Sequence, residues 1–402
     1  MHDPDRLSAG PLAGVRVVEL AGIGPGPFAT MLMADLGADV VRVDRPVPDA
    51  FADAAAKDVV NRGKRSVAVN VRSQEGLDFV RELIARADVF VEGNRPGVAE
   101  RLGLGPDELR DSNPRLVYAR MTGWGQEGPL AQAAGHDIDY IALTGLLWAT
   151  GRAEEDPVAP LNLLGDYAGG SMFLVVGVLA ALLERERSGQ GQVIDAAMVD
   201  GANVLSTMFT ALTQMGHWNP GVRGGNPLDS GAPWYDVYPC ADGGWIAVGA
   251  LEPQFYAQLV ELTGFRANRP EDRFDQPGPE AWPAMKAEWA ELWLTRTRDD
   301  WAALLAETDA CVQPVLDWAE REDHPHLRAR RSFVDVGGIT QPAPAPRFSR
   351  TPLSTPSPAP IVGEHNGAVE NELASLDAAL ARLIETDTVA SAAGPAAEGE
   401  GR

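Results

Sequence analysis

The chain has 402 residues, and 34 Lys and Arg against 57 Asp and Glu give it a formal net charge of −23. This length indicates two or three domains, and an apolar fraction of 45% is that of a globular rather than a disordered protein. The acidic balance argues against nucleic acid as a partner, because phosphate contacts need a basic surface. The net charge is still compatible with an anionic small-molecule ligand that binds in a local basic pocket.

Cysteine content and the chain ends narrow the class further. Two cysteines, Cys240 and Cys311, are too few for a disulfide scaffold or a Cys-based zinc site. The N-terminal residues lack the apolar core of a secretory signal, so we expect a cytoplasmic protein. The longest uncharged apolar stretch, residues 168–183, is short for a bilayer crossing, which needs about 20 residues. We therefore expect a buried helix there and no membrane contact.

The first part of the chain alternates strand-like and helix-like segments. Strands are expected at residues 15–20, 38–44, 66–71, 88–93, 115–123 and 191–198, and helices at 28–37, 76–87 and from Asp166 onward. Strand–helix alternation with short connections predicts an α/β fold with a parallel sheet covered by helices on both faces.

The second part indicates a smaller α+β module. A helical pattern over 196–215 places Met198, Met208 and Met215 on one stripe, which predicts core packing. A flexible apolar surface that accepts varied acyl chains is the alternative. A hairpin is expected around residues 242–244, followed by helices that carry three tryptophans. The predicted organisation is a large domain (1–197 and 341–387), linkers (198–233 and 323–340), a small domain (234–322) and a disordered tail (388–402).

The segment GIGPGP follows the first expected strand and imitates a dinucleotide-binding turn, with Asp44 twenty residues after Gly24. However, Pro25 and Pro27 remove two backbone N–H donors that a pyrophosphate would use. A tight turn with proline opening the helix is the better interpretation. An NAD-dependent dehydrogenase is thus the weakest functional hypothesis.

Two polar residues at expected helix starts carry the candidate chemistry. His136, in AGHDIDYIALTG, lies where a helix dipole favours neutral imidazole, a general base near pH 7. Asp166, in NLLGDYAGGSMF, is flanked by Gly165, Gly169 and Gly170, which leave room for close approach of backbone or ligand. For each residue taken alone, a structural role is the better interpretation: a helix N-cap for Asp166, and an N-cap or a satisfied polar residue for His136. On opposite faces of one carbon, the pair could remove a proton from either side.

Basic residues are scarce, so their clustering is informative. They gather around the ends of the expected strands: Arg42, Arg45, Arg62, Lys64, Arg65, Arg72, Arg95 and Arg101. In so acidic a chain they predict a pocket for a phosphorylated ligand at the carboxyl ends of parallel strands. Solvated surface charge is the alternative for each one alone.

Seven segments together carry a resemblance to a known family: PLAGVRVVELAGIGPGPFATMLMADLGADVVRVDRP, EGNRPGVAERLGLGP, RLVYARMTGWGQEGP, AGHDIDYIALTG, PLNLLGDYAGGSMFL, GQGQVIDAAMVDG and LEPQFY. The chain resembles the alpha-methylacyl-CoA racemases, within the class III CoA-transferase superfamily, from Pro11 to Arg350. The resemblance implies a Rossmann-like large domain that binds CoA without nicotinamide, a smaller inserted domain, and an interlocked homodimer with the active site between subunits. It implies no metal and no cofactor beyond the CoA of the acyl-CoA substrate.

The resemblance also assigns site residues. The family's catalytic His and Asp fall on His136 and Asp166, and a supporting acidic residue falls on Glu252. The CoA-contacting positions that it implies are Arg45, Val69, Asn70, Val71, Arg72, Gly93, Asn94, Arg95, Arg101, Gly135, Asp137, Ile138, Asp139 and Tyr140. Residues 70–72 read Asn-Val-Arg where the family usually has Asp-Leu-Lys, so backbone contacts to adenine are expected there.

Two activities share this fold. In a CoA-transferase, the residue matching Asp166 attacks a thioester and carries CoA through a covalent intermediate. A racemase needs a second base, because one group cannot serve both faces of a carbon. Transferases generally have an aromatic residue at the position of His136, so the string 135–137, together with Glu252, favours a racemase. The predicted reaction is epimerisation at C2 of 2-methylacyl-CoA through an enolate, stabilised by a backbone N–H at a helix N-terminus.

Overall fold

The computed structural model describes residues 10–46 and 55–375. They form two compact units: of the described residues, those of 10–122, 171–196 and 335–375 belong to unit 1, and those of 123–170 and 197–334 belong to unit 2. This division differs from the predicted domains, because residues 123–170 group with unit 2 rather than with the first domain. The predicted disordered tail and residues 376–387 of the predicted large domain lie outside the described residues.

A six-stranded sheet in the order β3-β2-β1-β4-β5-β6 forms the centre of unit 1. Its strands are β1 (Arg16–Leu20), β2 (Asp39–Asp44), β3 (Arg65–Ala68), β4 (Val89–Glu92), β5 (Val117–Thr122) and β6 (Val193–Ala197). The pairings of β1 with β2 and β4, of β2 with β3, and of β4 with β5 are parallel. This is the Rossmann strand order, so the predicted α/β fold with a parallel sheet is confirmed.

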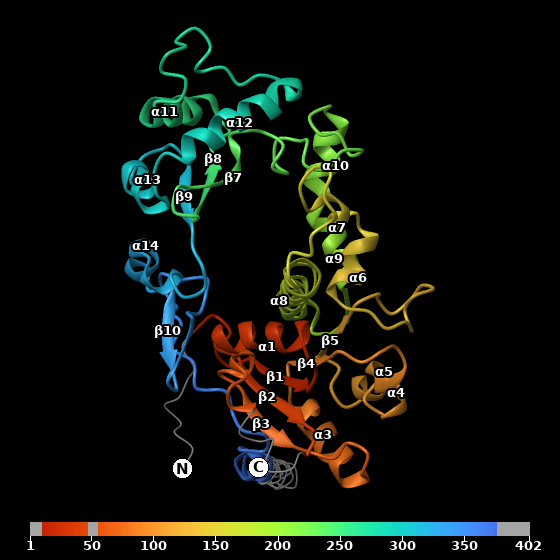
Figure 1. Cartoon of the computed structure of the whole chain (residues 1–402). Coiled ribbons are helices and arrows are strands. Elements are labelled where there is room, and N and C mark those ends of the chain that lie inside the picture. The colour runs from red at the N-terminus through yellow and green to blue at the C-terminus, as the bar shows by residue number, and fades with distance from the viewer. Residues whose placement is uncertain (1–9, 47–54, 376–402) are drawn as a thin grey trace, which may run out of the picture. The chain divides into compact units, whose positions relative to one another are not determined.

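Helices cover both faces of this sheet (Figure 1). The helices and turns of unit 1 are α1 (Pro25–Asp35), η1 (Val59–Asn61), α3 (Gln74–Ala85), α4 (Val98–Arg101), α5 (Pro106–Arg110) and α8 (Met172–Ser188), with the short ribbon β10 (Phe333–Val336) and β11 (Ile339–Pro342) at its boundary. Helix α1 packs against β1, β2 and α8, whereas Val18 and Val41 share a core with Ile84 of α3. Side chains alternate along a strand, so Val17 and Val18, both buried, reach opposite faces.

The predicted strand at 66–71 is too long. Strand β3 ends at Ala68, and residues 70–73 form a turn instead. Asn70 makes this turn, because its carbonyl accepts the N–H and the hydroxyl of Ser73 while its side-chain oxygen accepts the N–H of Arg72. Asn side chains that bind nearby backbone in this way compete with strand pairing.

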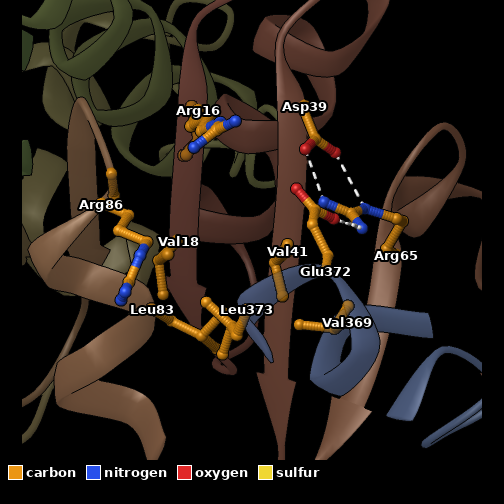
Figure 2. Close-up of a pocket in the computed structure, with 12 residues that line it drawn as sticks. Arg16, Val18, Asp39, Val41, Arg65, Leu83, Arg86, Val369, Glu372 and Leu373 are labelled. Carbon is orange, nitrogen blue, oxygen red and sulfur yellow. Dashed lines mark hydrogen bonds and ion pairs between the residues drawn. The ribbon is translucent and has the colours of Figure 1, made fainter. Parts of the chain in front are cut away.

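The C-terminal segment covers the open edge of β3. The N–H of Ser66 donates to Nδ1 of His365, and the N–H of Ala68 donates to Oδ1 of Asn366. Figure 2 shows Arg65 held between Asp39 and Glu372 beside a small pocket. Because Arg65 and Asp39 begin their parallel strands, this pocket lies at the amino ends of the strands, opposite the edge where a nucleotide is expected.

Unit 2 contains a three-stranded antiparallel sheet, β7-β8-β9, and helices. Its elements are α6 (Asp137–Leu143), α7 (Leu146–Ala149), η2 (Leu163–Ser171), α9 (Met198–Leu205), α10 (Thr207–Gln214), β7 (Tyr235–Pro239), β8 (Trp245–Gly249), α11 (Pro253–Thr263), η3 (Pro279–Ala281), α12 (Trp282–Trp293), α13 (Arg298–Leu305), β9 (Val312–Val315), η4 (Arg321–Asp323) and α14 (Pro325–Ala329). The predicted hairpin around residues 242–244 is confirmed as β7–β8. Trp289, Trp293 and Trp301 are buried in one core, as expected for helices that carry them.

Helices α9 and α10 confirm the helical pattern expected over 196–215. Two expectations of burial are wrong. Met208 and Met215 are exposed although Met198 is buried. The apolar segment Leu163–Ser188 is long and apolar enough to span a membrane by length and composition, a test that core helices also pass. Its helix α8 buries Leu174, Val175 and Val178 but leaves Val176 exposed, so it is buried on one face only.

Candidate functional site

His136 is the N-cap residue of α6, where the sequence predicted a helix start. The carboxylate of Asp139 accepts the backbone N–H of His136 at 2.9 Å, which fixes the first turn. Tyr140 packs edge-on against Trp124 and donates its hydroxyl to the carbonyl of Gly135, so the loop before His136 is anchored as well. The His136 side chain itself is exposed. A fixed backbone thus presents an accessible imidazole.

One interpretation of the sequence made Asp166 a helix N-cap, and this interpretation is wrong. Asp166 lies inside η2, a π-helical segment that leads into α8, and such segments often occur at functional sites. The close backbone packing around Gly169 accounts for this geometry: a Cβ there would lie 2.8 Å from the nitrogen of Ala202, and one on Gly201 would collide with the carbonyl of Gly169. The wider π-turn lets η2 lie directly on α9.

The surroundings of Asp166 favour its protonated form. Burial raises the pKa of this half-buried carboxyl, and the negative charge of Asp137 adds to the increase. A hydrogen bond from Asn162 to Oδ2, at 3.1 Å, and the nearby His136 act in the opposite direction and only partly offset it. Asn162 was not singled out from the sequence, although its position four residues before Asp166, about one helical turn, could have indicated this contact. A carboxyl group with a raised pKa is suited to act as an acid.

One side chain joins the two candidate segments. Oδ2 of Asp137, the residue after His136, accepts the N–H groups of Gly165 at 2.6 Å and of Asp166 at 2.7 Å. The structure therefore brings His136 and Asp166 into one neighbourhood of unit 2, as the chemistry requires. The carboxylate of Asp137 and the ring of Tyr140 are buried in this arrangement and make contacts within the protein, and the CoA contact predicted for the loop 135–140 stays a prediction.

The basic residues divide into two groups, one paired within the protein and one exposed. Arg42, Arg62, Lys64 and Arg65 make ion pairs with carboxylates of unit 1. The side chains of Arg62 and Lys64 are buried, and that of Arg42 is mostly buried, each in an ion pair with a carboxylate. The prediction that these three residues line a ligand pocket is wrong. Their partners come from other strands and helices, which a linear sequence does not reveal.

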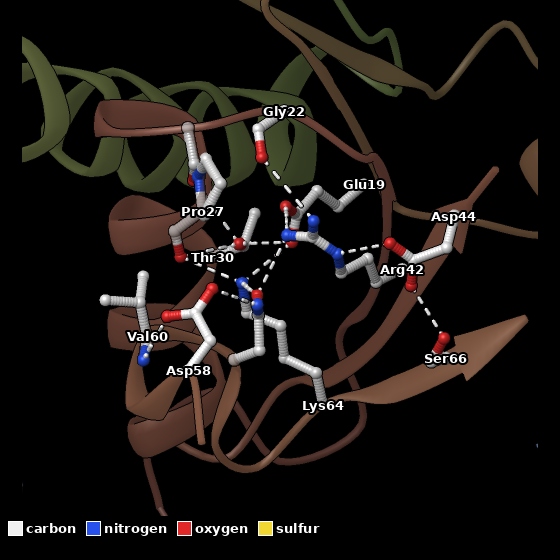
Figure 3. A network of polar contacts seen from close by, with 12 residues as sticks. Glu19, Gly22, Pro27, Thr30, Arg42, Asp44, Asp58, Val60, Lys64 and Ser66 are labelled. Atoms are coloured by element: carbon white, nitrogen blue, oxygen red, sulfur yellow. Dashed lines mark hydrogen bonds and ion pairs between the residues drawn. The ribbon is translucent and has the colours of Figure 1, made fainter. Parts of the chain in front are cut away.

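Figure 3 shows the network around Glu19. The ammonium of Lys64 donates to Glu19 at 2.8 Å and to the carbonyl of Pro27 at 2.9 Å, while Arg42 donates to Glu19, Asp44 and the carbonyl of Gly22. Burial alone would raise the pKa of Glu19, but the charges of Lys64 and Arg42 outweigh it and lower that pKa. These contacts tie the turn after β1 to β2.

The same network disfavours a dinucleotide site. Asp44 accepts from Arg42 at 2.8 Å and from the hydroxyl of Ser66 at 2.6 Å, so its carboxylate is engaged where a ribose would need it. Helix α1 begins at Pro25 after Gly24, whose φ of 72° belongs to the left-handed region. The interpretation as a tight turn opened by proline is confirmed.

The second group of cations is free. Arg45, Arg72, Arg95 and Arg101 are exposed, and within residues 10–46 and 55–375 their guanidinium groups have no carboxylate partner. Arg45 follows β2, residues 69–72 follow β3 and residues 93–95 follow β4, so these positions share the carboxyl edge of the parallel sheet. The side chains of Val69 and Val71 are partly buried and pack against the core.

Comparison with known proteins identifies the family. Residues 12–366 match the model of the CoA-transferase family III. The chain belongs to this family. It is 46% identical over 364 residues to the alpha-methylacyl-CoA racemase of Mus musculus, covering 90% of this chain and 93% of the relative. The alpha-methylacyl-CoA racemase of Homo sapiens is 43% identical over 365 residues, with the same two coverages.

A solved member of the family supports the fold over its whole length. The crystal structure of a CAIB/BAIF family protein from Brucella suis superposes with a TM-score of 0.79 at 29% identity, covering 91% of this chain and all of that one.

The remaining residues singled out from the sequence stay predictions for a family III protein. Glu252 is the exposed N-cap residue of α11, as expected for a helix-start carboxylate. In the described residues, no group of three His, Cys, Asp or Glu side chains is arranged to hold a metal.

Proposed function

We propose that the protein epimerises C2 of 2-methylacyl-CoA thioesters by proton transfer, with His136 and Asp166 as the two acid–base groups. The observation that carries the proposal is their juxtaposition: an exposed imidazole and a half-buried carboxyl of raised pKa interact electrostatically, and Asp137 connects their backbones. The 46% identity to an alpha-methylacyl-CoA racemase supports the same reaction.

The steps balance without a redox partner. The imidazole of His136 takes the C2 proton from one face, and the electron pair of the C–H bond forms the C1=C2 bond of an enolate. The carboxylic acid of Asp166 then gives its proton to the other face of C2, and the enolate returns to the thioester. The roles reverse for the other epimer. Burial of Asp166, which favours its protonated form, suits the donor step.

We propose further that Arg45, Arg72, Arg95 and Arg101 bind the phosphate groups of CoA. Their support is their exposure, their lack of carboxylate partners in the described part of the chain, and their common edge of the sheet. Arginine binds phosphate through two parallel N–H donors, and local positive charge is needed because the chain as a whole is strongly acidic. No cofactor other than the CoA of the substrate takes part in the proposed reaction.

Incubating each epimer of a 2-methylacyl-CoA in deuterated water tests the proposal. Inversion at C2 with deuterium in the product supports it. Transfer of CoA to an added carboxylate, through a thioester on Asp166, would assign the protein to the transferase reaction instead. Hydride transfer with NADH would restore the third hypothesis. Mass spectrometry of the products and of the intact protein separates the three results.

We also propose that two copies associate through the exposed face of α8. Met172, Val176, Leu179 and Leu183 are exposed on this helix at spacings of four, three and four residues, which place them on one stripe. Val176 is 60% and Leu183 68% exposed, and such a continuous apolar stripe is typical of a surface that another chain covers.

Placing lysines on this stripe is expected to dissociate the dimer. In Val176→Lys/Leu183→Lys, two ammonium groups would have to be buried at the interface without partners. Light scattering after gel filtration should give twice the chain mass for the wild type and the single mass for the variant. Asp107→Lys, on an exposed turn of α5, is the matched control and should stay dimeric. A variant that keeps the dimer mass contradicts the assignment.

A further inference from the structure

The carboxylate of Asp137 is placed unusually for a residue in the first turn of a helix. It is only 4% exposed, and it points back to the π-helical segment η2 rather than to solvent. Its Oδ2 accepts two consecutive backbone N–H groups, those of Gly165 and Asp166, at 2.6 and 2.7 Å. Two short hydrogen bonds to one carboxylate oxygen make this contact a strong local constraint.

The packing around the contact leaves it no freedom. A Cβ on Gly165 would lie 2.8 Å from Oδ2 of Asp137, so only glycine lets the two segments approach this closely. Asp137 is the direct chain neighbour of His136, and Asp166 is one of the two residues that it holds. One carboxylate therefore fixes the backbone of one acid–base residue to the backbone next to the other.

We propose that Asp137 is a positioning residue for the epimerisation, whose carboxylate sets the separation of His136 and Asp166. The inference rests on the proposed function. It differs from the CoA contact predicted for Asp137, because both hydrogen bonds go to the protein. In a reaction that needs one base on each face of a single carbon, an error in this separation affects the chemical step rather than the binding of CoA.

A second property of Asp137 acts in the same direction. Its other oxygen, Oδ1, is buried and has no hydrogen-bond partner among the described residues. Burial raises the pKa of Asp166 most, the charge of Asp137 raises it further, and Asn162 and His136 lower it. A neutral side chain at position 137 would thus lower the pKa of Asp166, and it would also hold the backbone of Asp166 less firmly.

Two variants separate positioning from simple stability. Asp137→Asn keeps an oxygen that can accept the two N–H groups, and Asp137→Ala removes it. We expect kcat for inversion to fall about 10-fold in the first and about 100-fold in the second, the size produced by misplacing a reacting group by about 1 Å. KM for the thioester should change less than about threefold in both, since the arginine edge of unit 1 is untouched. Asp156→Asn, an exposed carboxylate in the loop before η2, is the control and should keep wild-type kcat.

The outcomes are distinguishable. Graded loss of kcat with an unchanged KM supports the proposal, and the Asn variant alone carries the test if the Ala variant does not fold. Wild-type kcat in both variants, or a loss confined to KM, overturns it while leaving the racemase reaction intact. A wild-type protein that exchanges no C2 proton overturns the proposed function and with it this role of Asp137.

Discussion

Exchange without inversion is the expected result when His136 is replaced by alanine. The epimer whose C2 proton faces His136 should become inert. The epimer whose proton faces Asp166 can still lose it and regain a deuteron on that same face. Inversion of either epimer should fall by about 10²–10⁴-fold, the usual contribution of a general acid–base group. Asp166→Asn should give the mirror image, with the other epimer keeping exchange. NMR of each epimer in deuterated water measures both quantities.

Matched variants make this result specific. His217→Ala removes another exposed histidine of unit 2 and should behave as the wild type. Asp156→Asn serves the same purpose for Asp166. If His136→Ala inverted both epimers at the wild-type rate, His136 would have no part in the reaction. If both variants lost exchange from both epimers equally, the two side chains would act together as one base unit instead of one base on each face.

Local pattern predicted most elements of unit 1. Its strands are runs of β-branched residues bounded by turn residues, and the helix α3 has its apolar residues at helical spacing, so β1, β2, β4, β5 and α3 fall where the sequence put them. The His136 cap was predicted for the same reason. The turn at residues 70–73 was missed because the side chain of Asn70 binds nearby backbone and ends the strand early.

Features that depend on distant contacts were not predictable. The π-helical placement of Asp166 follows from the close approach of Gly169 to Gly201, which are 32 positions apart. The role of Asp137 depends on residues 28 and 29 positions away. Met208 fits a core stripe by spacing alone but is exposed, since periodicity shows that a face is apolar and not what covers it.

A large loss of stability is expected for Lys64→Met. The ammonium of Lys64 is fully buried, as is Glu19, and the replacement keeps the length of the side chain while removing its charge. Glu19 would then keep only Arg42 and Thr30 as partners. Breaking a buried ion pair by removing one member costs about 3–5 kcal/mol, because the remaining charge stays desolvated. Urea denaturation followed by circular dichroism should show the loss, and Lys57→Met, which removes an exposed lysine, should not.

The pH dependence identifies the cause. In the wild type the pKa of Glu19 is lowered on folding, so its contribution to stability is present above the unfolded pKa and is lost as the pH falls through the folded pKa. Without Lys64, burial dominates and raises the pKa of Glu19, so the variant binds a proton on folding and loses less stability in acid. The difference between the two proteins should therefore shrink as the pH falls from 7 toward 4. A second change, Glu19→Gln in the Lys64→Met background, should recover part of the loss at neutral pH by removing the unpaired charge. A difference that stays constant with pH, or a double variant no more stable than the single one, would show that packing of the lysine stem and not the ion pair supports this turn.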